Sequence, residues 1–158
     1  MDSIRIFGYK SFKKLSVQLH PINLLIGANG AGKCNFLSLF EMLANIYEKR
    51  LGAYVAQVGG VDKLLYQGRK VTERIAVNLL TAKREYDLEL LESDGKLIVE
   101  REVVRCYDDV CPLDLVRKNV ITEFQSESSL KDHKEEDLSN YISQIRKFHF
   151  HDTGRRSP

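Results

Sequence analysis

The chain has 158 residues, of which 43% are hydrophobic and 29% are charged, and its formal net charge is +2. This composition is typical of a soluble globular protein with one domain. Residues 1–60 carry a mild excess of basic residues that could suit phosphate or nucleic acid, although most such charges lie on a solvated face. No apolar run approaches the roughly 20 residues of a membrane span, and residues 1–14 have no apolar stretch of the signal-peptide type. We therefore expect a cytoplasmic protein without a membrane partner.

The cysteines argue against two kinds of stabilising cross-link. There are three of them, Cys34, Cys106 and Cys111, and no CxxC pair occurs. An odd number without paired spacing disfavours both a disulfide framework and a zinc site. The three cysteines are expected to be free thiols.

Two alternating segments open the chain. Ile4 and Ile6 alternate with Arg5 and Phe7, and residues 15–20 alternate in the same way. This period of two predicts a pair of half-buried antiparallel strands.

A strand, a loop and a helix are predicted next. Residues 22–27, INLLIG, form a continuous apolar run of the kind expected from a strand covered on both faces. Phe36, Phe40, Leu43 and Tyr47 then recur at helical spacing. Lys49 and Arg50 suit the negative end of the helix dipole, and Gly52 offers a stop.

Residues 27–35, GANGAGKCN, fit the phosphate-binding pattern G-x-x-x-x-G-K-[ST] at all positions but the last. Glycines permit a tight loop whose amides point inward, the helix start adds a positive dipole end, and Lys33 can reach the outer phosphates. An ordinary glycine-rich turn is the alternative, but it leaves Lys33 and the run of small residues unexplained. The expected strand and helix on either side favour a phosphate loop.

Cys34 stands where the pattern requires a hydroxyl. That hydroxyl is a hard oxygen ligand for Mg²⁺, and a thiol is soft and larger, so Cys34 is a poor ligand at the magnesium position. Nucleotide affinity is expected to be weakened and not abolished. A redox-sensitive thiol is the alternative, because a helix N-terminus beside a lysine lowers the pKa of a thiol.

Residues 4–43, from IRIFGYKSF through NLLIGANGAGKCN to FEML, resemble the opening of ABC-class ATPases of the RecF and SMC type, in particular the related prokaryotic AAA-family ATPases. Residues 59–70 and 148–154 resemble later segments of that family. The resemblance implies an α/β (α+β lobe) fold, that of a P-loop NTPase with an ABC-ATPase-like N-terminal lobe, and binding of ATP with Mg²⁺. The implied nucleotide-binding residues are Gly27, Ala28, Asn29, Gly30, Ala31, Gly32, Lys33, Cys34 and Asn35.

An antiparallel meander is predicted over residues 75–104. Apolar and polar residues alternate over residues 75–79 and 86–90, and Asp94-Gly95 is typical of a two-residue turn. Residues 97–104, LIVEREVV, are expected to form the returning strand. The meander is similar to the small β-subdomain of such ATPases. We predict a nucleotide-binding lobe over residues 1–120, then a flexible, serine-rich connection from residue 121 and a helix marked by Leu138 to Ile145, which together make up residues 121–158.

The last candidate site is the FHFHD stretch. His149 and His151 would share one face of a strand, and with Asp152 they are plausible metal ligands. No further spaced cluster completes such a site, so a structural strand end is favoured. Cys106 and Cys111 likewise read as free thiols and not as ligands.

No catalytic residue for hydrolysis is identified. The resemblance calls for an apolar strand ending in Asp-Glu and a signature loop near LSGG, and neither occurs in the sequence. The chain alone is therefore expected not to hydrolyse ATP. A simple P-loop kinase is disfavoured by the antiparallel opening strands.

Two classes of function stay open. One is an ATP- or ADP-binding lobe of an ATPase for DNA maintenance or phage defence, completed by a protein partner or by self-association. The other is a non-catalytic interaction module that keeps the P-loop fold. DNA is a possible partner through Lys10, Lys13 and Lys14, although lysines in a hairpin are usually solvated.

Overall fold

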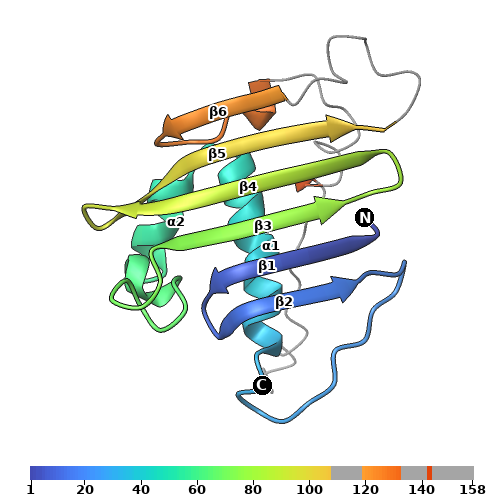
Figure 1. The fold of residues 1–158 in the computed structure, drawn as a ribbon. Helices are drawn as coiled ribbons and strands as arrows, with labels where there is room; N and C mark the ends of the chain where they lie inside the picture. Colours follow the sequence, from blue (N-terminus) through green and yellow to red (C-terminus); the bar gives the residue numbers. More distant parts are fainter. Residues whose placement is uncertain (108–118, 133–141, 144–158) are drawn as a thin grey trace, which may run out of the picture.

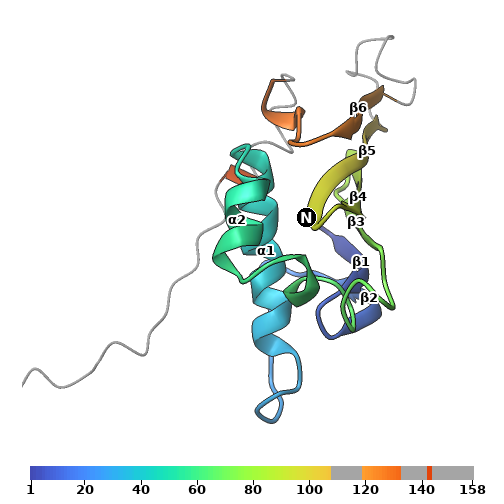
Figure 2. The same cartoon turned by 90° about the vertical axis from the view of Figure 1, so that its left-hand side faces the viewer.

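The computed structural model describes residues 1–107, 119–132 and 142–143, which build one antiparallel sheet with helices on one of its faces (Figures 1 and 2). The sheet has six strands in the order β2-β1-β3-β4-β5-β6. A mixed α/β fold is thus confirmed, in a two-layer form. The strands are β1 (Ser3–Tyr9), β2 (Phe12–Gln18), β3 (Arg74–Leu80), β4 (Arg84–Ser93), β5 (Lys96–Cys106) and β6 (Asn119–Gln125).

The sheet forms where the sequence alternates between apolar and polar residues. The opening hairpin of β1 and β2 and the meander of β3 to β5 are both present, as predicted. The meander is not a separate unit, because β3 pairs directly with β1 and joins both parts into one sheet. Asp94 and Gly95 have φ angles of 50° and 76°, the conformation that a two-residue hairpin turn requires.

The core lies between the helix-facing side of the sheet and the helices. Apolar side chains from alternate positions of β1, β3, β4 and β5 meet one stripe of the first helix. The buried residues of the sheet include Ile4, Ile6, Ile75, Val77, Leu79, Tyr86, Leu88, Leu90 and Val99, and those of the helix are Phe36, Leu39, Met42, Leu43 and Ile46.

Two helices replace the single predicted one. Helix α1 (Lys33–Tyr47) is followed by α2 (Leu51–Gln57), and a short 3-10 helix, η1 (Val61–Lys63), comes next. Gly52 was expected to end the first helix, but it lies inside the first turn of α2. The chain turns earlier, at Lys49, whose φ of 56° is left-handed. The prediction of Gly52 as a stop was therefore wrong.

The predicted strand over residues 22–27 is also wrong. The segment belongs to no strand, and its apolar side chains face solvent: Ile22, Leu24 and Ile26 are 89%, 81% and 83% exposed. The sheet ends at β2, so no strand of the described residues supplies this segment with a hydrogen-bonding neighbour. Apolar content alone does not make a strand without such a neighbour.

Regular elements occur in the stretch that was predicted to be a flexible connection from residue 121. Strand β6 pairs antiparallel with β5, and η2 (Leu130–Asp132) follows it. The Glu102 carboxylate, which is 0% exposed, accepts hydrogen bonds from Ser128 Oγ at 2.6 Å and from Ser129 N at 3.0 Å. Glu127 accepts one from the first amide of α2, Leu51 N, at 2.9 Å. These hydrogen bonds connect residues 127–131, which we call the strap, to β5 in the sheet and to α2 in the helical layer.

The predicted C-terminal helix lies mostly outside the described residues. Ile142, within the short described part, is helical and belongs to the hydrophobic core.

Candidate phosphate-binding loop

The glycine-rich loop precedes α1 directly and is exposed along residues 27–31. It folds onto itself, because Lys33 Nζ donates hydrogen bonds to the carbonyl oxygens of Gly27 at 2.6 Å and Ala28 at 2.7 Å. A further bond runs from Ala31 N to Ala28 O at 3.2 Å. The lysine ammonium therefore lies inside the curve of the loop and at the N-terminus of a helix of 15 residues.

Two glycines are needed for this loop path. Gly30 and Gly32 have φ angles of 84° and 92°, a region that other residues rarely adopt. At Gly32 the space is also restricted, since a Cβ would lie 3.2 Å from the ring of Phe12 and 3.2 Å from Ser11 Oγ. The glycine spacing that suggested a phosphate loop thus has a structural cause at both positions.

The electrostatics of the loop suit an anion. Gly32 is the N-cap of α1 and makes no side-chain capping bond, and the first turn carries no acidic residue. The amides of that turn and the helix dipole therefore face the loop together with the Lys33 ammonium. Such a set of donors can bind a phosphate group.

Cys34 is exposed in the first turn of α1 and is a free thiol. Its position follows Lys33 as the motif requires, but its sulfur is not a ligand that Mg²⁺ favours. The part of the chain that the structure describes holds no group of three or more His, Cys, Asp or Glu side chains placed to bind a metal. The loop residues fit the phosphates of a nucleotide better than they fit its magnesium.

The turn between β1 and β2 packs against the glycine-rich loop and the first turn of α1. Asn35 Nδ2 donates to Ser11 Oγ at 2.9 Å, which brings the residue after the loop onto this turn. Sequence reasoning singled out Asn35 but missed Ser11 as its partner. It also missed the hydrogen bond between the hydroxyls of Tyr9 and Ser38, at 2.9 Å, because neither residue belongs to a sequence motif.

Not all of the remaining predicted candidates lie within the described residues. His149, His151, Asp152 and Cys111 lie outside the described residues, and so the metal-ligand alternative stays a prediction. Lys13 and Lys14 are exposed on β2. Lys10 is not simply solvated, since its ammonium donates to Ser38 Oγ at 2.8 Å.

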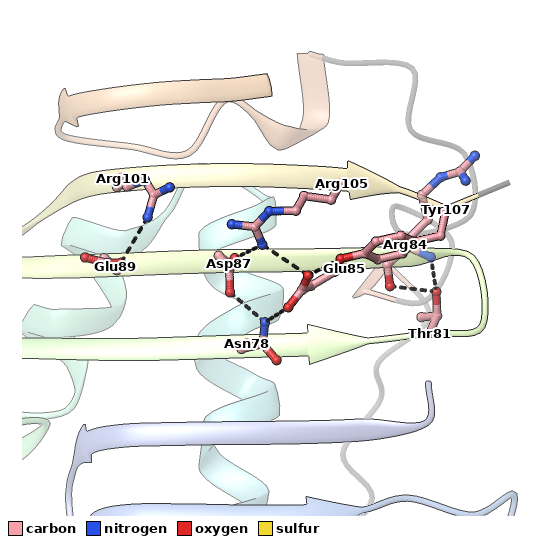
Figure 3. A network of polar contacts seen from close by, with 9 residues as sticks. All are labelled: Asn78, Thr81, Arg84, Glu85, Asp87, Glu89, Arg101, Arg105 and Tyr107. Carbon is pink, nitrogen blue, oxygen red and sulfur yellow. Dashed lines mark hydrogen bonds and ion pairs between the residues drawn. The ribbon is translucent and has the colours of Figure 1, made fainter. Parts of the chain in front are cut away.

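A network of polar side chains from β3, β4 and β5 lies on the sheet face opposite the helices (Figure 3). Arg105 on β5 pairs with Glu85 at 3.1 Å and with Asp87, and Asn78 Nδ2 donates to both of these carboxylates. A hydrogen bond from the Tyr107 hydroxyl is the main reason that the pKa of Glu85 lies below its usual value. Each of these side chains thus has a hydrogen-bond or ion-pair partner on a neighbouring strand, as on many exposed sheet faces. The cluster therefore needs no ligand to explain it.

The loop and the two-layer fold define a mixed α/β protein with a glycine-rich loop at a helix N-terminus. The AAA ATPase domain family matches residues 1–152, and the chain belongs to this family of ATP-binding, ATPase-type modules. No curated protein gives a significant match. None of the helices in the described ranges is long and apolar enough to cross a membrane.

Proposed function

We propose that the chain binds the phosphates of ATP or ADP through residues 27–35, as the nucleotide-binding lobe of a RecF/SMC-like ATPase. The observation that carries the proposal is the Lys33 ammonium held inside a glycine loop at the start of α1. Membership of the AAA ATPase domain family supports the same conclusion.

Each part of the loop has a separate task in this proposal. The main-chain amides of Ala28, Asn29 and Gly32 surround the phosphate oxygens, and Lys33 exchanges its two carbonyl partners for the outer phosphates. Mg²⁺, when bound, would neutralise phosphate charge, and Cys34 would hold it poorly. Asn35 keeps the first turn of α1 against the β1–β2 turn.

We propose further that the chain by itself does not turn over ATP. Hydrolysis needs a carboxylate that orients water and a second support for Mg²⁺, and the sequence offers no apolar strand that ends in such a pair. A protein partner or another copy of the chain would supply them. A place in DNA maintenance or phage defence follows from the RecF/SMC resemblance alone.

A non-catalytic interaction module is the second candidate function. The exposed apolar segment at residues 22–26 favours it, because exposed rows of Leu and Ile commonly mark contact surfaces. Under this alternative the loop keeps its fold without binding nucleotide at physiological concentration.

An ATP titration by calorimetry separates the two candidates. We expect the wild-type chain to bind ATP, and Lys33→Ala to bind at least about a hundredfold more weakly, because the variant loses a charge-assisted contact to phosphate. Lys96→Ala, which removes the same charge from the β4–β5 turn, is the matched control and should bind normally. Equal affinities of the wild type and Lys33→Ala at low salt would contradict the proposal.

A further inference from the structure

A buried hydroxyl lies under the start of α1 and joins it to the opening strand. Ser38 is buried, and its Oγ donates to the carbonyl oxygen of Asn35 at 2.8 Å. The same oxygen lies 2.9 Å from the Tyr9 hydroxyl and accepts from Lys10 Nζ at 2.8 Å. A hydroxyl has one hydrogen and two lone pairs, so these three bonds use its full capacity, with Tyr9 as a donor.

Further contacts enclose the Ser38 group. The Tyr54 hydroxyl on α2 donates to the Ser38 carbonyl oxygen at 3.2 Å. Burial raises the pKa of Tyr9 far above its usual value, so its hydroxyl stays protonated and available as a donor. Three elements, β1, α1 and α2, therefore converge on one serine two turns or less from the phosphate loop.

The backbone beside Lys10 is held in a conformation that is uncommon for its residue type. Lys10 has a φ of 46°, in the left-handed region. Its amide donates to Leu64 O at 2.7 Å, and its ammonium reaches Ser38. Such a conformation persists when the surroundings fix it at several points. The β1–β2 turn is thus anchored on both sides.

The anchored turn sets the position of the loop. Phe12 and Ser11 lie so close to Gly32 that a Cβ there would touch both, and Ser11 accepts the hydrogen bond from Asn35. Any shift between α1 and the turn would move Gly32, and with it Lys33, relative to a bound phosphate.

We propose that Ser38 is a positioning residue of the phosphate loop. In this role Ser38 acts through the loop and not on the phosphates directly. Its hydroxyl fixes the first turn of α1 against the β1–β2 turn, so that Lys33 and the loop amides keep the spacing that phosphate requires. This inference rests on the proposed nucleotide-binding function.

The test compares ATP affinity with global stability in matched variants. Ser38→Ala removes all three bonds of the hydroxyl, and Ser38→Thr restores a hydroxyl at the same place. Asn45→Ala is the control, because Asn45 also donates to a main-chain carbonyl of α1, Glu41 O at 2.9 Å, but lies two turns farther from the loop. Calorimetry gives the affinity, and urea unfolding gives the stability of each variant.

We expect Ser38→Ala to bind ATP about tenfold more weakly and Ser38→Thr to recover most of the affinity. Asn45→Ala should lose stability without losing affinity. Lys10→Met is a second variant if Ser38→Ala does not fold, since it removes the ammonium from the same hydroxyl and leaves the helix sequence unchanged. It should weaken binding in the same direction.

The alkylation rate of Cys34 by iodoacetamide gives a local readout, resolved from Cys106 and Cys111 by peptide mass. ATP should protect Cys34 in the wild type and in Asn45→Ala, and protection by the same ATP concentration should be lost in Ser38→Ala. If the wild type shows neither binding nor protection, the proposed function fails and the positioning role fails with it. If Ser38→Ala binds and protects as the wild type does, only the positioning role is overturned.

Discussion

Cys34 is the residue at which this loop departs from the phosphate-binding pattern. Its exposed sulfur occupies the first turn of α1, where an oxygen would be available to a magnesium ion. We expect Cys34→Ser to tighten ATP binding about tenfold in the presence of Mg²⁺, because a hard oxygen ligand replaces a soft sulfur. In EDTA the two proteins should bind alike. Titrations of both proteins under the two conditions measure this difference.

Cys34→Ala is the matched control for that change. Both substitutions remove the thiol, but only serine adds an oxygen, so alanine should not raise the affinity. A gain with alanine as large as that with serine would mean that the bulk of the sulfur, and not its poor coordination of Mg²⁺, weakens binding.

At the scale of single residues, the sequence predicts the loop better than it predicts the support of the loop. Gly30, Gly32 and Lys33 stand out because backbone conformation and charge restrict the choice of residue there. Ser38 and Tyr9 do not stand out, since their role depends on which segments the fold brings together. Tertiary contacts of that kind leave no local pattern.

Among the elements, the strap of residues 127–131 offers the clearest test of stability. Glu102 accepts bonds from Tyr86, Ser128 and Ser129 N, so both of its oxygens act as acceptors. Glu102→Gln turns one acceptor into a donor that faces other donors. We expect the free energy of unfolding to fall by about 1–3 kcal/mol, as for a buried polar group left without a partner. Urea unfolding measures it.

Glu92→Gln provides the comparison, because the Glu92 carboxylate accepts a hydrogen bond from the main-chain amide of Gly95, at 2.8 Å, in an exposed hairpin turn. Its effect should stay below about 1 kcal/mol. Hydrogen exchange should also speed up at residues 128–130 in Glu102→Gln. Equal losses of stability in both variants, with unchanged exchange at those residues, would refute a special role for the strap.

The elements themselves were predictable where period and turn chemistry agree. The hairpin, the β3–β5 meander and its Asp94-Gly95 turn follow from alternation and from a two-residue turn type. The predictions were wrong where the structure of a segment depends on the segments that pack beside it. Residues 22–27 have the composition of a strand without a strand beside them, and β6 pairs along β5 although most of it falls in the stretch that was predicted to be a flexible connection. Gly52 reads as a stop, although the chain turns at Lys49.

For the whole molecule, the exposed segment of residues 22–26 predicts association. Its three outward side chains leave a row of apolar surface next to the phosphate loop. We expect the wild-type chain to self-associate at micromolar concentration, and the combined Ile22→Thr, Leu24→Thr and Ile26→Thr variant to stay monomeric. Sedimentation velocity over a dilution series measures this. Stability should change little, because the substituted side chains are exposed.

Val71→Thr is the control, since Val71 is also an exposed apolar residue but lies in a different loop. It should associate as the wild type does. A wild-type chain that stays monomeric and does not bind a hydrophobic dye would show that this segment is no contact surface.

The internal hydrogen bonds of Lys33 have a consequence for handling the protein. Within the described residues, the hydrogen-bond partners of its ammonium are two neutral carbonyl oxygens, so no carboxylate among these partners competes with an anion for the lysine. Multivalent inorganic anions should compete for the loop far better than chloride does, because their charge and oxygen geometry resemble those of a phosphate group. Sulfate or phosphate buffers would then occupy the loop during purification and lower the apparent affinity for any nucleotide added later.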